Sequence, residues 1–432
     1  IVDATSGTNG STVTATSNTT RYLFSAAPTT NGKVQIIATQ IPLATVVAPV
    51  ANPTAPIIAP VIDALPLTPT TAPLLTAITL LPNAAAVAGA LAQLQPGAAS
   101  LAAPQASYRI TQQFQGLWAA HMESIQLPCE QNDQPDDRNK QRQDNAAACQ
   151  PDKRDPQLWA AAFGFAGTQR DNNGYEGYTD NAHGAMLGLD IPLSRATTAG
   201  VGVRYARSTL DGLDSQSRGN IRSYQATAYL GYAPGPWFVN AALVYGRDDY
   251  SSSRRVVFPG TSETARADYS GHQYTAFAAT GYHFFVGDGR TVITPTATLQ
   301  YTRLKIPGYS EAGGNAVNLK VDARSDDFLQ SGLGVKFARD LASSGPLTIR
   351  PEVHANWLHS FRGEAMSGTA AFESGGPSFT ATGVKPGRDL LDLGAGLLLA
   401  SSTRWSLEGT YDYQLNHSYR SGQVMVKLAL AL

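Results

Sequence analysis

Apolar residues alternate with small or polar ones through the last thirteen positions of the chain, Arg420 to Leu432. One face of this pattern holds only apolar residues: Val424, Val426, Leu428, Leu430 and Leu432. Because successive side chains of a β-strand point to opposite sides, the period of two predicts a strand with one apolar face. A strand of this kind at the end of a chain is typical of the closing strand of a membrane β-barrel, which predicts further alternating segments upstream.

Twelve segments from Gln157 onward carry strand patterns, counting this last one. Their ranges are 157–168, 182–194, 196–208, 220–233, 236–249, 269–285, 290–304, 323–340, 346–361, 387–400, 403–416 and 420–432. Every second connection is a short turn, whereas most of the others are long and polar, such as 248–269, 305–324 and 362–385. Short turns at one end and long loops at the other predict a twelve-stranded antiparallel outer-membrane barrel and not a soluble sandwich.

Aromatic residues limit the apolar face of two of these strands. Trp237 and Tyr245 begin and end one apolar face, and they are separated by about 20 Å along the membrane normal, close to the height of the apolar band of a barrel. Trp405 and Tyr413 repeat the arrangement near the end of the chain. The predicted aromatic girdles comprise Trp159, Trp237, Tyr245, Trp357, Trp405 and Tyr413.

Charged residues collect on the opposite face of the strands. A charge that faces lipid at mid-depth costs about 2 to 4 kcal/mol, so these side chains are expected to face a water-filled lumen. The predicted lumen-facing residues are Asp190, Arg204, Lys336, Arg350, Glu352, Asp392, Glu408 and Lys427.

Composition divides the chain ahead of the strands. Residues 1–42 contain short β-prone runs, and residues 43–82 contain seven prolines that predict an extended linker. Residues 83–125 become helical, with a break at Pro96-Gly97, and a polar loop covers 126–156. No run of about eighteen apolar residues occurs, which excludes a membrane-spanning helix. The chain starts at Ile1 without an initiating Met or a signal peptide, so we expect a fragment of a longer protein.

The segment 104–125 is the candidate for a helix inside the pore. At about 1.5 Å per residue it spans roughly 33 Å, enough to cross a barrel. Its polar residues would face the lumen wall: Arg109, Gln112, Gln113, Gln115 and Glu123. They could bond to wall residues such as Glu352, Asp392, Arg350 and Lys336. The alternative is a helix outside the barrel in a soluble domain. A helix in the pore predicts a poorly conducting channel whose conductance rises when residues 1–125 are removed.

The two cysteines, Cys129 and Cys149, lie in the polar loop. If both ends of the barrel sheet face the periplasm, this loop is periplasmic, an oxidising compartment where a disulfide can form. A bridge closing about twenty residues would contribute roughly 3 kcal/mol in the loop-entropy model. The alternative is two free thiols.

Charge and histidine placement argue against other classes of function. A formal net charge of -1 gives no reason to expect nucleic acid. The seven histidines show no metal-ligand spacing, so we predict no metal site and no cofactor. A hydrolase on the barrel surface would need an outward Ser and His at one height on neighbouring strands, and no nucleophile motif occurs, so we predict no enzymatic activity. A porin shares the strands and the lumen, but it does not need the linker and helix.

The whole chain resembles the C-terminal translocator of monomeric autotransporters, the type V secretion proteins. The stretches that carry the resemblance are Asn83 to Ala88 with Ala90-Leu91, Leu158-Trp159, Arg350-Pro351-Glu352 and Trp357-Leu358-His359. It implies a monomer in the bacterial outer membrane that exports its own passenger to the cell surface. It also implies insertion by the outer-membrane β-barrel assembly machinery, delivery by periplasmic chaperones, and contact with outer-membrane lipids including lipopolysaccharide.

Two features depart from the family pattern. The terminal residue is Leu432, where the family usually has an aromatic residue, so the assembly signal formed by Val424, Val426, Leu428, Leu430 and Leu432 is less ideal. No Asn-Asn pair lies between Pro104 and Ile125, and Asn172-Asn173 falls in the first outer loop instead. We therefore expect no self-cleavage inside the barrel.

Overall fold

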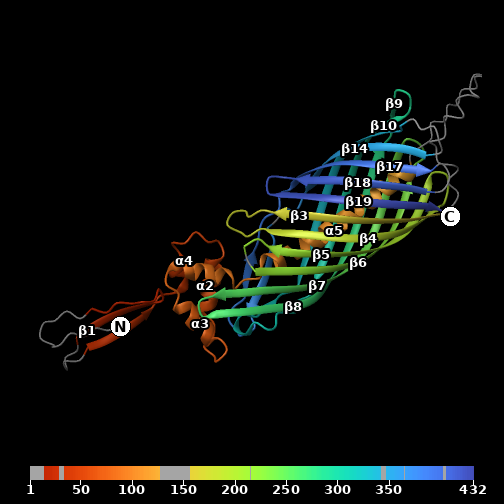
Figure 1. Cartoon of the computed structure of the whole chain (residues 1–432). Coiled ribbons are helices and arrows are strands. Elements are labelled where there is room, and N and C mark those ends of the chain that lie inside the picture. Colours follow the sequence, from red (N-terminus) through yellow and green to blue (C-terminus); the bar gives the residue numbers. More distant parts are fainter. Residues whose placement is uncertain are drawn as a thin grey trace, which may run out of the picture.

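Twelve long strands form a closed antiparallel barrel around one helix in the computed structural model (Figure 1). The structure describes residues 14–28, 34–126, 156–214, 216–341, 347–363, 365–401 and 405–432. The barrel strands are β3 (Gln157–Gln169), β4 (Tyr178–Pro192), β5 (Thr197–Gly212), β6 (Gln216–Tyr232), β7 (Trp237–Phe258), β8 (Thr261–Tyr282), β10 (Thr291–Ile306), β13 (Arg324–Arg339), β14 (Leu347–Ser360), β17 (Asp389–Ser401), β18 (Trp405–Leu415) and β19 (Tyr419–Ala431). A short strand, β9 (Phe284–Val286), adds to the edge of β10.

The last strand pairs with the first and closes the barrel. β19 runs antiparallel to β3, with Ala429 opposite Trp159, and β10 pairs with β13 across the sequence between them. The predicted number of strands is therefore confirmed, and so is the pairing of the closing strand near Trp159. Because the side-chain period of a strand is two, each pairing also fixes which residues face the lumen.

The hairpin of β7 and β8 extends much farther than predicted. Residues 248–269 were expected to form a long loop, but the two strands remain paired to Phe258 and Thr261. Gly260 adopts a φ of 85° in the turn, a conformation that favours glycine. The prediction was wrong because Ser, Arg and Asp residues occupy both faces of much of this part of the hairpin, so no regular hydrophobic alternation marks it.

Two other outer connections also contain strands. β11 (Tyr309–Ser310), β12 (Leu319–Val321), β15 (Ser367–Phe372) and β16 (Phe379–Thr382) form a four-stranded sheet, with the 3-10 helix η3 (Asn315–Val317) beside it. Arg254 of the extended β7 binds this sheet region, since its guanidinium contacts Glu311 at 2.5 Å and donates to the Val317 carbonyl at 2.8 Å. The outer loops are thus a folded cap on the barrel.

The segment predicted as an extended linker, 43–82, is helical. It contains α1 (Leu43–Val47), α2 (Ala55–Asp63) and α3 (Ala72–Thr79), followed by α4 (Ala84–Ala92). Pro occupies the first turn of both α2 and α3, where its missing N–H would have no partner in any case. The prediction failed because these prolines lie at the starts of helices. The helices pack together and bury apolar residues such as Ile58 and Ile62. Ahead of the helices, β1 (Tyr22–Pro28) and β2 (Val34–Gln40) form a hairpin.

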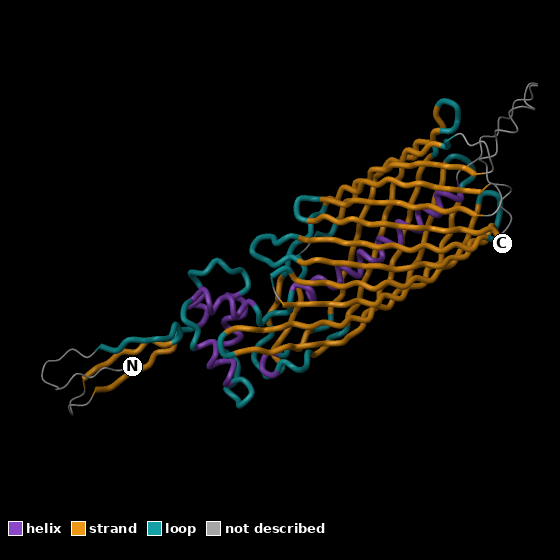
Figure 2. Tube along the Cα trace, in the orientation of Figure 1, coloured by secondary structure: helices purple, strands orange, loops and turns teal. Residues whose placement is uncertain are grey.

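The helix α5 (Ala98–Gln126) runs through the lumen, as the tube in Figure 2 shows. It begins at Ala98 and not at Pro104, and its 29 residues span about 43 Å. A Cβ at Gly97 would overlap Ser217 of β6, whose hydroxyl accepts a hydrogen bond from the Ala99 N–H at 3.3 Å. The absence of a side chain at Gly97 therefore lets the helix start against the barrel wall.

None of the helices in the described part of the chain combines the length and apolarity needed to cross a membrane.

Candidate functional site: the helix-filled lumen

Arg109 ties the outer half of α5 to the seam where the barrel closes. Its Nη1 lies 2.8 Å from Asp180 Oδ2 of β4, and its guanidinium carbon lies 3.8 Å from the ring centroid of Tyr419 in β19. Arg109 is 8% exposed and Asp180 1% exposed. Breaking a buried pair by removing one partner is strongly destabilising, so this contact fixes the helix to β4 and to the last strand, β19.

Neutral hydrogen bonds connect the middle of the helix to other strands. The Thr111 hydroxyl accepts from the amides of Gln225 at 2.9 Å and Gln273 at 2.7 Å. On another side of the helix, Gln112 donates to Gln330 Oε1 at 2.5 Å. These contacts reach β6, β8 and β13, so the helix is bonded to several parts of the wall.

A buried aromatic and ionic cluster surrounds His121 near the inner end of α5. The His121 Nε2 lies 2.6 Å from Asp190 Oδ2, and its ring stacks on Trp159 at 4.2 Å between centroids. Tyr229 completes the cluster, because its hydroxyl donates to Asp190 Oδ1 at 2.6 Å and accepts from the Trp159 indole at 3.1 Å. The polar atoms that face one another here come from α5, β3, β4 and β6.

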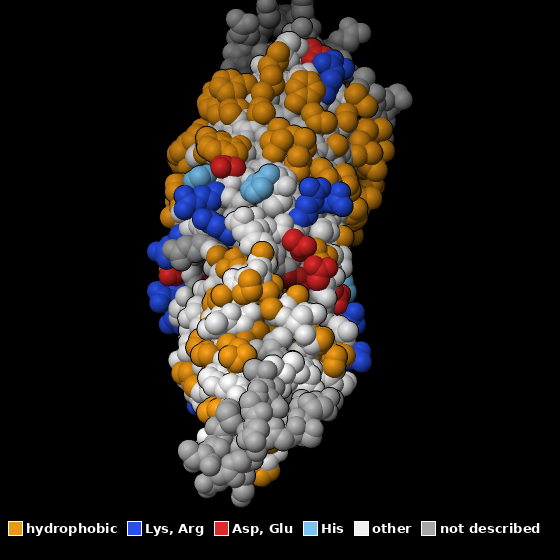
Figure 3. Space-filling view, turned by 90° about the vertical axis from the view of Figure 1, so that its left-hand side faces the viewer, with side chains coloured by type: hydrophobic (Ala, Val, Ile, Leu, Met, Phe, Trp, Pro, Cys, Tyr) orange, Lys and Arg blue, Asp and Glu red, His pale blue; other side chains and the backbone are white. Residues whose placement is uncertain are grey.

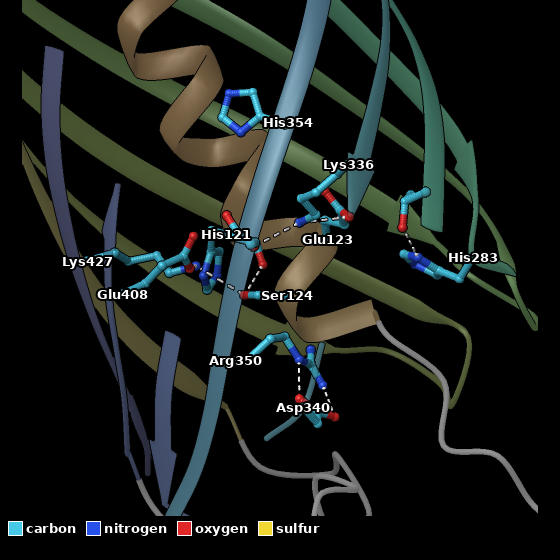
Figure 4. Close-up of polar contacts among 12 residues, drawn as sticks. His121, Glu123, Ser124, His283, Lys336, Asp340, Arg350, His354, Glu408 and Lys427 are labelled. Carbon is cyan, nitrogen blue, oxygen red and sulfur yellow. Dashed lines mark hydrogen bonds and ion pairs between the residues drawn. The ribbon is translucent and has the colours of Figure 1, made fainter. Parts of the chain in front are cut away.

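Two lysines of the wall meet the last turns of the helix (Figure 4). Lys336 of β13 lies 2.8 Å from Glu123 and 3.4 Å from Glu352. Lys427 of β19 lies 2.6 Å from Glu408 and donates to the Ser124 hydroxyl at 3.1 Å. Each lysine therefore contacts one residue of the helix and one glutamate of a neighbouring strand.

The residues predicted to face the lumen all lie on the inner side of the barrel wall or at the short-turn end of the barrel. Arg350 pairs with Asp340 at 2.5 Å near the short-turn end, and Asp392 accepts a hydrogen bond from Asn356 at 3.3 Å. The Arg204 guanidinium has no hydrogen-bond partner among the described residues, and it lies 5.4 Å from the Phe114 ring centroid of the helix. The remaining ones are those named above: Asp190, Lys336, Glu352, Glu408 and Lys427.

The predicted helix residues differ in what they contact. Arg109, Gln112 and Glu123 bind the wall as described. Gln113 and Gln115 are buried, and within the described part of the chain both amide atoms of Gln115 lack a hydrogen-bond partner. Of the wall residues suggested as partners, Lys336 contacts the helix through Glu123. Arg109 of the helix binds Asp180, which was not among the suggested partners.

Several contact residues were not found from the sequence. They are Ser107, Thr111, His121, Ser124, Trp159, Asp180, Tyr229 and Tyr419. Alternation alone gives the face of a wall residue, but it does not give its height relative to the helix. One signal could have identified Trp159 as an inward residue. It lies on the same face of β3 as the aromatic residues Phe163 and Phe165, whereas the opposite face holds small residues.

Trp159 is a correction to the predicted girdles. It is 1% exposed and points into the lumen, whereas the outward residues of β3 are small, such as Ala160, Ala162 and Gly164. A Cβ at Gly188 of β4 would overlap its indole, so the wall leaves space for it. The other predicted girdle residues face outward with exposures of 38 to 48%: Trp237, Tyr245, Trp357, Trp405 and Tyr413.

The outward face of the closing strand is apolar. The side chains proposed as assembly signal are exposed to between 41 and 67%: Val424, Val426, Leu428, Leu430 and Leu432. The two predicted disulfide residues, Cys129 and Cys149, lie outside the described residues.

The helix does not fill the lumen evenly. Its main packing is against β4 to β7 and β10. On the opposite side, a cavity of about 200 Å³ opens between α5 and strands β13, β14, β17 and β18, lined by Gln105, Tyr108, Gln112, Arg324, Gln330 and Asn416 among others. The helix is therefore an off-centre plug.

Comparisons with known proteins agree with this architecture. The family model of the autotransporter beta-domain matches residues 158–412. Esterase EstA of Pseudomonas aeruginosa is 27% identical over 284 residues, which cover 63% of this chain and 42% of EstA. Outer membrane protein A of Rickettsia rickettsii is 24% identical over 281 residues, 62% of this chain and 12% of that protein. The chain thus spans less than half the length of these curated relatives.

Among solved structures, the translocator domain of the autotransporter NalP from Neisseria meningitidis is similar in fold. It superposes with a TM-score of 0.56 at 16% identity, covering 76% of this chain and 98% of that domain. The fold and the occupied lumen define an outer-membrane β-barrel translocator with a helix in its pore. The chain belongs to the autotransporter family, through a beta-domain whose family model matches more than half of its length. Its location is the bacterial outer membrane, and a porin or a barrel-embedded hydrolase is not favoured.

Proposed function

We propose that this barrel exports its own N-terminal passenger and afterwards keeps α5 in the pore as a plug and anchor. The observation that carries the proposal is the continuous path of the chain. It leads from the hairpin of β1 and β2, through the helices α1 to α4 at one end of the barrel, along α5 and out at the other end (Figure 1). A segment that crosses the lumen once, with the preceding residues outside, is the arrangement expected after export.

The ion pairs along α5 support a plug that stays in place. Arg109 in the outer half of the helix and His121 near its inner end bind carboxylates of the wall, and Glu123 binds Lys336. A channel that conducts solutes has no use for a helix bonded to several strands. The off-centre position of α5 supports a small residual conductance and not a complete seal.

Conductance in planar bilayers tests the plug. The whole chain is expected to give small, stable current steps, and the chain without residues 1–125 is expected to give steps several times larger. Equal steps for the two forms, both inserted as heat-modifiable folded barrels, would refute the plug.

We assign the exported passenger to the N-terminal side of the helices and no catalysis to the barrel. The esterase activity in the name of EstA is a property of that protein. The chain from Ala98 onward is expected to show no hydrolysis in esterase assays, and hydrolysis by that part would contradict this assignment.

We also propose that residues 126–156 lie in the periplasm with Cys129 bonded to Cys149. α5 ends at Gln126 and β3 begins at Gln157, and the polar composition between them suits an aqueous compartment. Peptide mapping of protein extracted from membranes is expected to find the two cysteines linked, and two free thiols would contradict the bridge.

Insertion by the β-barrel assembly machinery, delivery by periplasmic chaperones and contact with lipopolysaccharide belong to the same proposal.

Arg207 and Arg222 are direct cross-strand neighbours, exposed two residues beyond the outward Tyr205 and Tyr224. Cationic and histidine side chains form a band beside the apolar part of the surface in Figure 3. Such a band suits the phosphates of lipopolysaccharide.

Lipopolysaccharide that co-purifies with the barrel measures this contact. The variant R207A/R222A is expected to carry less of it than the native chain, while R290A, altered in a short turn at the other end of the barrel, keeps the native amount. No difference between these variants would remove the band as the binding surface.

A further inference from the structure

His354, Asp392 and Asp412 form a cluster on the lumen wall that the helix does not use. One ligand atom from each, the imidazole nitrogen and two carboxylate oxygens, lies within 4.8 Å of the other two. They belong to β14, β17 and β18, which are consecutive in the barrel. Main packing of α5 is against other strands, so this cluster lies on the less supported side of the wall.

Strand register explains how the three side chains meet. His354 is opposite Gly394, and Gly394 is opposite Asp412, so the three lie in one row across three strands. A Cβ at Gly394 would overlap both Asp412 and the His354 ring, which therefore reach each other over the bare glycine at 3.0 Å. Asp392, two residues before Gly394 on the same face, completes the group.

The cluster has carboxylate oxygens without donors. Asp412 is 6% exposed, and its Oδ1 lies 3.0 Å from His354 Nε2, whereas its Oδ2 has no hydrogen-bond partner among the described residues. Asp392 uses Oδ2 to accept from Asn356, and its buried Oδ1 has no partner in the described part of the chain. Burying a charged oxygen without compensation is costly, so these two oxygens favour a bound cation.

The neighbouring lysines of the lumen are engaged elsewhere. Lys336, the cross-strand neighbour of His354, directs its ammonium to Glu123 and Glu352, and the His354 ring lies apart from that ion pair in Figure 4. Lys427 is paired with Glu408. Within the described ranges, His354 is the one basic side chain recorded in an ion pair with Asp412, and no ion pair is recorded for Asp392.

We propose that His354, Asp392 and Asp412 bind a divalent transition-metal ion, with Zn²⁺ as the ion that fits best. One imidazole and two carboxylates match its mixed nitrogen and oxygen preference, and bonds of about 2.0 to 2.2 Å require only a modest contraction of the cluster. The His354 side chain keeps 17% exposure, so one ligand remains in contact with the lumen. The ion would link three strands on the side that α5 leaves open.

Sequence spacing does not predict this site, because its ligands include only one histidine. His354 lies 38 residues before Asp392 and 58 residues before Asp412. Only the register of β14, β17 and β18 brings the donors together.

Zn²⁺ titration of the whole folded chain in detergent tests the site. All variants carry C129S/C149S, because cysteine thiols also bind Zn²⁺. The matched control is H359Q/D389N, which removes another His–Asp pair, at 2.8 Å on the outer surface, that has no third ligand. Binding is measured by competition with a chromogenic chelator, and Co²⁺ absorption reports the ligand geometry.

The parent and the control are expected to bind one Zn²⁺ per chain at the same affinity. D412N is expected to weaken binding by about tenfold or more, the range typical of an altered metal site. D392N, at the half-buried position, provides the same test if D412N does not give a heat-modifiable folded barrel. The proposal is overturned if the parent binds no stoichiometric Zn²⁺, if D392N and D412N bind it unchanged, or if Mg²⁺ displaces Zn²⁺ at equal concentration.

Discussion

At the scale of single residues, the lumen depends on a few buried polar partners. Arg109 holds α5 through Asp180 and the Tyr419 ring, His121 holds it through Asp190, and Glu123 holds it through Lys336. Each pair joins the helix to a different part of the wall. Loss of one partner would leave its counterpart charged and buried, which costs more than loss of a surface pair.

The variant R109A is expected to destabilise the helix-filled barrel by about 3 to 5 kcal/mol, because Asp180 is left unpaired at 1% exposure. Urea-dependent unfolding in detergent, followed by the loss of heat-modifiable migration, measures this change. The matched control is R218A, which removes an ion pair whose arginine side chain is 64% exposed and is expected to change stability by less than about 1 kcal/mol. Equal effects of the two variants would show that the Arg109 pair does not hold the helix.

Single residues also show what the sequence can and cannot predict. The alternation of the strands placed Lys336, Glu352 and Lys427 on the inner face, and the charge of Lys336 and Glu352 suggested them as partners of the helix. It failed for Trp159, because an aromatic residue near a strand start was assigned to the lipid side although its neighbours Ala160 and Leu158 have the outward parity. Asp180 was not identified as a partner of the helix. The height of a residue along the barrel axis depends on strand register and tilt, and the sequence of a single strand does not determine either of them.

At the scale of elements, the outer ends of the strands and the N-terminal helices support one another. Arg254 of the β7 extension donates to the Gln93 carbonyl at 2.9 Å, just after α4, and also binds Glu311 beside the outer sheet. The Gln93 side chain accepts from the Val257 N–H at 2.7 Å. The extended hairpin is thus a bracket between the cap and the helices that precede α5.

Removal of this bracket should loosen the helices without opening the barrel. The variant R254A is expected to speed proteolysis within residues 43–97 several-fold, because local opening of a segment becomes easier when its buried contacts are removed. Limited proteolysis with mass spectrometry locates the cuts. The neighbour Arg255, exposed on the opposite face of β7, supplies the control R255A, and equal cutting of both variants would contradict the bracket.

Elements were predictable wherever one face meets lipid. There the period of two is visible in the sequence, and the strand boundaries lie within a few residues of those observed. The β7 extension and the short helices α1 to α3 escaped prediction for a common reason. Both lie outside the membrane, where a strand or helix need not have a regular apolar face. Pro60 and Pro73 do not decide the matter, because proline is found in helices as well as in extended chain.

At the scale of the whole molecule, the barrel, its outer cap and the helices form one path from outside to inside. The chain belongs to the autotransporter family, and we propose that the segment before α5 lies on the cell surface while α5 stays in the lumen. Leu67, between α2 and α3, is 78% exposed, whereas Ser107 is fully buried inside the barrel against Tyr250. These two positions report the two compartments.

Thiol labelling of intact cells tests this claim most directly. In a C129S/C149S background, L67C is expected to react with a membrane-impermeant maleimide on whole cells, and S107C is expected to stay unlabelled until the protein is unfolded. Labelling of L67C only after the outer membrane has been permeabilised would contradict the account, because the segment before the helix would then lie on the periplasmic side.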